Sequence, residues 1–162
     1  MPDRPESEPT TPGAPRQPVV VGVKLLREGA RLPQRAYEGD AAYDLFSADD
    51  AILPPLARAV VGTGIALELP AGVAALTLPR SGLAARHGIS LVNSPGLIDP
   101  GYRGEIKLIL HNTDQQMSFY VQPGERIAQL LVVSLVPVEL AQVPDISDTP
   151  RGERGFGSSG AD

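Results

Sequence analysis

Residues 105–111, EIKLILH, decide the fold class because apolar and polar side chains alternate along them. One face of the extended segment carries Ile106, Leu108 and Leu110, and the other carries Glu105, Lys107 and His111. Successive side chains of a β-strand point to opposite faces, so this pattern predicts a strand with one face in a hydrophobic core.

The apolar segments on either side of this stretch are short and bounded by glycine or proline. The chain holds 17 residues of each type, which favours turns over long helices. Further strands are expected at 18–26, at 56–69 with a break at Gly62–Gly64, at 73–79, and at 127–143, where Pro137 makes two strands or one bent strand. One short helix is expected at 81–87, with Ser81 as its N-cap. Together these elements predict an all-β sandwich, jelly roll or barrel.

The length, composition and charge of the chain limit the number of domains and the kinds of partner that can be expected. A chain of 162 residues is the usual size of one domain. Residues 1–17 are too polar and proline-rich to order themselves, and 146–162 form a flexible arm rich in glycine, so the folded domain is expected at 18–145. The net charge of −5 argues against a nucleic-acid polymer as partner. Without a signal peptide or a long apolar run, a cytoplasmic protein with no membrane partner is expected.

Five segments combine turn-forming residues with groups that suit chemistry, namely AAYDLFS at 41–47, PRSGLA at 79–84, NSPGLIDPGYRG at 93–104, GERIAQL at 124–130 and RGERGFGSSG at 151–160. Each also has a purely structural reading. Asp44 can cap a turn, Gln129 can be a satisfied core amide, and a glycine-rich terminus is usually disordered. The chain contains no cysteine, and its two histidines lack metal-ligand spacing, so thiolate chemistry is excluded and a histidine-based metal site is not expected.

The same segments also suit a phosphorylated nucleoside. The start of a helix at Arg80-Ser81-Gly82 would present backbone N–H groups to an anion. In the third segment Asp99 lies beside a turn, where a carboxylate can hold a water, and Tyr102 offers a flat face for a sugar. In the last segment Phe156 could stack on a base and Arg151 could meet phosphate oxygens.

In their order and spacing, the five segments closely resemble the motifs of the trimeric dUTPase family over roughly residues 19–160. The resemblance implies a jelly-roll-like distorted β-barrel with one short helix, assembled as a homotrimer whose active sites are shared between chains. It implies hydrolysis of dUTP to dUMP and pyrophosphate with Mg²⁺ as cofactor. Such an activity limits uracil incorporation into DNA and supplies dUMP for dTMP synthesis.

The resemblance also implies a role for each matching residue. Asp99 is expected to activate the attacking water, and Asp44 to contact the metal through water. The phosphates would be bound by Arg80, Ser81, Gly82, Gln129 and Arg151. The nucleoside would be bound by Asn93, Leu97, Ile98, Asp99, Tyr102, Lys107 and Phe156. Tyr102 would exclude a ribose 2′-hydroxyl, and backbone groups of the third motif would read the uracil edge.

Departures from the family pattern are confined to two motifs. Ala42 stands where the first motif usually has glycine, and Arg154 replaces a glycine of the tail motif. Two alternatives stay open at this point. A dCTP deaminase shares the fold family but adds a general-base glutamate, and some proteins of this fold act by binding partners.

Overall fold

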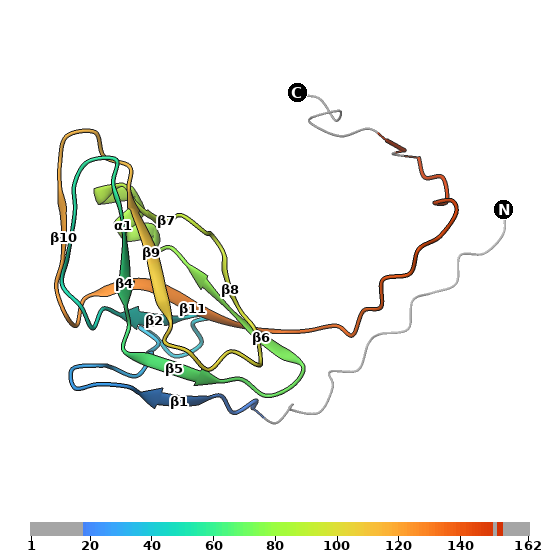
Figure 1. Ribbon diagram of the computed structural model, residues 1–162, viewed down its shortest axis with the longest axis horizontal. Coiled ribbons are helices and arrows are strands. Elements are labelled where there is room, and N and C mark those ends of the chain that lie inside the picture. The colour runs from blue at the N-terminus through green and yellow to red at the C-terminus, as the bar shows by residue number, and fades with distance from the viewer. Residues whose placement is uncertain (1–17, 151, 154–162) are drawn as a thin grey trace.

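The computed structural model describes residues 18–150 and 152–153. Within them the chain forms eleven strands and one helix (Figure 1). The strands are β1 (Gly22–Leu25), β2 (Tyr43–Phe46), β3 (Ala51–Leu53), β4 (Arg58–Gly62), β5 (Ile65–Glu68), β6 (Val73–Leu78), β7 (Ile89–Leu91), β8 (Gly96–Ile98), β9 (Lys107–Asn112), β10 (Phe119–Val121) and β11 (Arg126–Ser134). The helix is α1 (Ser81–His87).

Antiparallel pairing assembles these strands into four small sheets. A four-stranded sheet has the order β2-β11-β6-β8, and a three-stranded sheet has the order β4-β9-β7. Two ribbons, β1-β5 and β10-β3, complete the barrel. The architecture confirms the predicted all-β jelly roll with one short helix.

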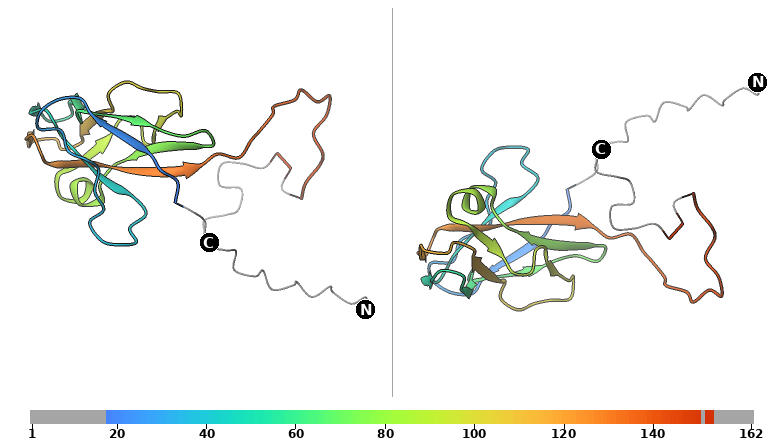
Figure 2. Two further views of the ribbon diagram at one scale, coloured as in Figure 1. Left: turned by 90° about the horizontal axis from the view of Figure 1, so that it is seen from below. Right: turned by 90° about the horizontal axis from the view of Figure 1, so that it is seen from above.

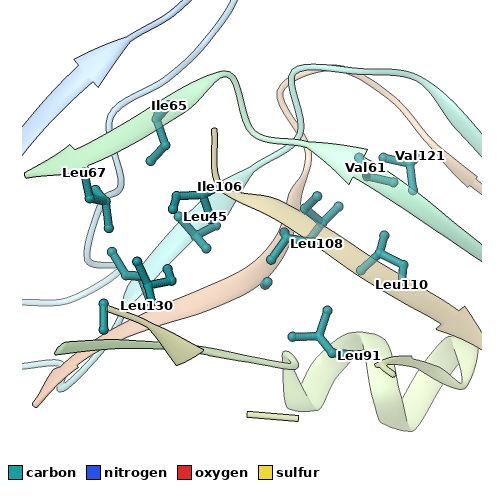
Figure 3. Close-up of a cluster of buried hydrophobic side chains, with 14 of the residues drawn as sticks. Leu45, Val61, Ile65, Leu67, Leu91, Ile106, Leu108, Leu110, Val121 and Leu130 are labelled. Carbon is teal, nitrogen blue, oxygen red and sulfur yellow. The ribbon is translucent and has the colours of Figure 1, made fainter. Parts of the chain in front are cut away.

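The core lies between the two larger sheets. Its side chains come from both and point toward one another (Figure 3). Ile106, Leu108 and Leu110 are all buried, as the alternation of residues 105–111 predicts. The break expected between β4 and β5 is also present, and Gly64 adopts a left-handed φ of 68° there. Among the described residues no helix is long and apolar enough to cross a membrane.

Helix α1 has the predicted bounds, but its cap differs by one residue. Arg80 is the N-cap, with extended φ and ψ of −91° and 124°, and it makes no side-chain capping bond. The backbone N–H of Ala84 donates to the carbonyl of Arg80 at 3.0 Å. The prediction of Ser81 as N-cap is therefore wrong, because the helical hydrogen bonds already begin at Arg80.

The long apolar run at 127–143 is only partly a strand. β11 ends at Ser134, and residues 135–143 pair with no strand in the part of the chain that the structure describes. They lead away from the barrel (Figure 2). Their apolar side chains are exposed, and Leu140 is 94% exposed. The expected second strand is wrong for the single chain, since a strand needs a partner to satisfy its backbone groups.

Candidate functional site

Asp44 is held by two arginines on the outer face of the four-stranded sheet. It is 5% exposed, and its Oδ1 lies 3.0 Å from Arg80 Nε. Its Oδ2 accepts a hydrogen bond from Arg126 Nη1 at 3.1 Å. Arg80 Nη1 also donates to the carbonyl of Arg126 at 2.9 Å. These contacts make one unit, the arginine–aspartate cluster of Asp44, Arg80 and Arg126.

Gln129 lies beside this cluster because of the register between β11 and β2. It lies directly opposite Asp44 on β2 and opposite Leu78 on β6. Directly opposed residues of antiparallel strands point to the same face, so the amide and the carboxylate share the outer face. A register shift between Arg126 and Ala128 inserts an extra residue into β11. This β-bulge brings Arg126 to the same face as Gln129, although the two residues are an odd number of positions apart along the strand.

The structure thus brings together two predicted phosphate-binding residues, Arg80 and Gln129, and the predicted metal-contacting Asp44. Ser81 and Gly82 follow directly in the first turn of α1. Arg126 was missed by the sequence analysis. The signal for it was present, because an arginine directly precedes the apolar run in GERIAQL.

A second feature is the connection between β7 and β9, which forms the predicted hairpin. The two strands pair, and β8 within the connection also pairs with β6. The connection encloses a cavity of about 220 Å³, here called the hairpin cavity. It is lined by Thr77, Asn93, Gly96, Leu97, Ile98, Asp99, Tyr102, Glu105, Ile106 and Lys107.

Six of the predicted nucleoside-binding residues lie on this one cavity, namely Asn93, Leu97, Ile98, Asp99, Tyr102 and Lys107. Asp99 is exposed, directly after β8, and its carbonyl accepts the Tyr102 backbone N–H at 3.1 Å. The turn at Pro100-Gly101 is closed by Arg103, whose Nη1 donates to the Pro100 carbonyl at 2.6 Å. Phe156, like the phosphate-binding Arg151 and the variant position Arg154, lies outside the described residues.

Tyr102 is fixed at two points. Its hydroxyl donates to the carbonyl of Glu105 at 3.1 Å. Its ring packs against Gly104, where an added Cβ would lie 2.6 Å from the ring carbon Cζ. A side chain at Gly104 would therefore displace the ring from the cavity wall.

The arginine–aspartate cluster and the hairpin cavity are separate in one chain. Asp44 lies on edge strand β2, whereas the cavity lies along the opposite edge strand, β8. Three strand spacings of roughly 4.8 Å separate these edges by about 14 Å.

Comparison with known proteins decides the family. A model of the dUTPase family matches residues 28–160. The chain belongs to the dUTPase family. Deoxyuridine 5'-triphosphate nucleotidohydrolases from two organisms illustrate the likeness. The Corynebacterium glutamicum protein is 50% identical over 143 residues, which cover 87% of this chain and 96% of that one. The Tropheryma whipplei protein (strain Twist) is 49% identical over 138 residues, which cover 85% and 94%.

Solved dUTPase structures share the fold. The dUTPase of Staphylococcus bacteriophage 80alpha, in complex with dUPNHPP, superposes with a TM-score of 0.81 at 34% identity, covering 88% of this chain and 99% of that one. A mutant dUTPase from phage phi11 of S. aureus, described with a structural Mg(II) ion, has a TM-score of 0.73 at 29% identity, covering 78% and 97%.

Proposed function

We propose that this dUTPase family member hydrolyses dUTP to dUMP and pyrophosphate, with the nucleoside in the hairpin cavity. The observation that carries the proposal is the gathering of six family-matched residues, Asp99 included, around that cavity. β8 is an edge strand, so the peptide groups on its far side are available to the edge of a planar base. Cytosine would present a donor where uracil presents an acceptor, which leaves buried groups unpaired.

Asp99 would hold the attacking water. The carboxylate is exposed and follows directly from β8, so it stands at the rim where the α-phosphate would emerge from the cavity. In-line attack on the α-phosphorus then displaces pyrophosphate and leaves dUMP. Positioning of the water matters more than basicity for this step, because phosphoryl transfer depends mainly on alignment and on stabilisation of charge.

The phosphates would meet the arginine–aspartate cluster, Gln129 and the start of α1 at Ser81 and Gly82. Arg80 and Arg126 supply two positive charges, and Asp44 holds their guanidinium groups in place from beneath. Arg151 would add a third charge from the C-terminal arm, with Phe156 covering the base. The roles of these two arm residues stay predictions.

Magnesium fits as an ion held mainly by the triphosphate. Mg²⁺ usually binds one or two carboxylates with phosphate oxygens and waters. Among the residues described, no group of three acidic or histidine side chains forms a protein cage. Asp44 Oδ1 lies 3.0 Å from Arg80 Nε but accepts no hydrogen bond within the described residues, so it keeps the capacity to accept one from a metal-bound water. When bound, Mg²⁺ would neutralise the phosphate oxygens as the leaving group departs.

A homotrimer with shared active sites is proposed on two observations. The cluster and the cavity of one chain lie at opposite edges of a sheet, so one dUTP reaches both more readily if they come from different chains. Residues 135–150 also expose apolar side chains that a neighbouring subunit could cover, at Val136, Val138, Leu140, Val143 and Ile146. A cytoplasmic location is part of the same proposal.

The test is turnover of the full chain with dUTP and Mg²⁺, measured as pyrophosphate release, beside native mass spectrometry. Pyrophosphate is expected, its release should stop with EDTA, and the native mass should be near three times 17.0 kDa. Bound dUTP without pyrophosphate would refute the enzymatic function. Ammonia released from dCTP would instead identify a deaminase. A monomer that turns over dUTP at full rate would refute the shared site.

A further inference from the structure

Glu105, which the mechanism above does not use, joins three parts of the chain at the base of the hairpin cavity. Its side chain is 15% exposed, and its Oε1 lies 3.0 Å from Arg27 Nη2. The same oxygen accepts the backbone N–H of Gly64 at 2.9 Å. Its Oε2 lies 3.8 Å from Lys107 Nζ. The carboxylate therefore ties the start of β9 to the loop after β1 and to the bend between β4 and β5.

The Glu105 carboxylate is enclosed on its other side by groups around Gly62. Arg27 also pairs with Asp49 at 2.7 Å, and Asp49 Oδ2 accepts the backbone N–H of Gly62 at 2.8 Å. A Cβ at Gly62 would lie 2.5 Å from Glu105 Oε1 and 2.6 Å from Asp49 Oδ2. The two carboxylates and the guanidinium close tightly around the Gly62 backbone, which leaves Glu105 little freedom to move.

Glu105 also holds Tyr102, but through its backbone. Its carbonyl accepts the Tyr102 hydroxyl at 3.1 Å. A shift of residue 105 would therefore carry the far end of the tyrosine ring with it. Because van der Waals exclusion is steep, a few tenths of an ångström at the ring decide whether an extra hydroxyl fits beside it.

We propose that Glu105 is a positioning residue for sugar discrimination. Its side chain fixes the carbonyl that holds the Tyr102 hydroxyl, and the ring thereby stays where it excludes a ribose 2′-hydroxyl. The inference rests on the role proposed for Tyr102 as the residue beneath the sugar. Glu105 acts through Tyr102 and touches no reacting atom.

The experiment compares kcat/KM for dUTP and for UTP in the full-length protein. Glu105→Gln keeps an acceptor for Gly64 but removes the charge that faces Arg27 and Lys107, and Tyr102→Phe removes the hydroxyl and keeps the ring. Each change should lower the dUTP-to-UTP ratio about fivefold, the scale of one hydrogen bond. The double variant should lower the dUTP-to-UTP ratio no further than either single variant, because both substitutions act on the same connection between Glu105 and the Tyr102 ring. Glu68→Gln, an exposed glutamate on β5, is the matched control and should keep the ratio.

A merely structural role would lower kcat/KM for both nucleotides in proportion and leave the ratio unchanged, which would overturn the proposal. Fully additive effects of the two variants would overturn it as well. Tyr102→Ala distinguishes failure of the role proposed for Tyr102 from failure of the role proposed for Glu105. An unchanged dUTP-to-UTP ratio in that variant refutes the role of Tyr102 itself. If Glu105→Gln does not fold, Arg27→Gln releases the same carboxylate from a side chain that is 39% exposed. Arg27→Gln should also lower the dUTP-to-UTP ratio, and an unchanged ratio in that variant refutes the positioning role of the Glu105 carboxylate.

Discussion

Replacing Asp44 by asparagine tests whether the arginine–aspartate cluster stabilises the junction of β2 and β11. Asparagine keeps the shape of the side chain but cannot neutralise Arg80 and Arg126, which face it at 3.0 and 3.1 Å. Removing one partner of a buried ion pair costs about 3–5 kcal/mol. The arginine side chains are 22% and 49% exposed, so water screens both. The expected loss in free energy of unfolding is therefore about 1.5–3 kcal/mol.

The assay is urea denaturation at one fixed protein concentration, because assembly would otherwise shift the midpoint. Asp50→Asn is the control, since Asp50 is exposed and directly precedes β3. Added salt should recover part of the loss in Asp44→Asn by screening the repulsion between the two guanidinium groups. An unfolding free energy within about 0.5 kcal/mol of the control, the scale of ordinary surface substitutions, would refute the reasoning.

Three further outcomes are expected. Asp99→Asn should still bind dUTP while turnover falls at least about 100-fold, the scale of a lost general base, and near-normal turnover in a pyrophosphate assay would refute its role. Truncation before Arg151 should reduce turnover far more than the thermal midpoint, because the buried core cluster of the described residues is built from side chains between Leu45 and Leu130; equal losses in activity and in calorimetry would contradict this. The pKa of Asp114 is lowered because the backbone N–H groups of Gln116 and Met117 donate to its carboxylate. Its contribution to stability is therefore present above the ordinary aspartate pKa and is lost as the pH falls below about 4. Asp114→Asn should flatten that part of the stability profile measured by denaturation at several pH values.

The fold was predictable where a segment is long enough to show a period. The alternation at 105–111 located β9 and its buried face, and the glycines at 62–64 located the bend between β4 and β5. Strands of three residues, such as β7 and β10, are too short to show any period. Their strand state comes from pairing with β9 and β3, and partners distant in sequence leave no local signal.

Some members of the candidate site were predictable, but their arrangement was not. The third motif is contiguous in sequence, and its residues indeed line one cavity. Arg126 escaped notice because its place beside Asp44 depends on the β-bulge in β11. Nothing in the residues near 126–128 indicates an extra residue there, since Ile127 and Ala128 are simply two buried apolar residues in a row.

The separation of the cluster from the cavity follows from the strand order of the four-stranded sheet. Asp44 lies on edge strand β2, whereas Leu97 and Ile98 of the opposite edge strand, β8, line the cavity. Strands β11 and β6 lie between them, so the two groups of residues are about 14 Å apart across the sheet. Under the proposed function one dUTP would contact both groups, and it would do so more readily if they came from different chains. In the proposed trimer each chain would supply the cavity of one site and the cluster of another, and every site would be complete.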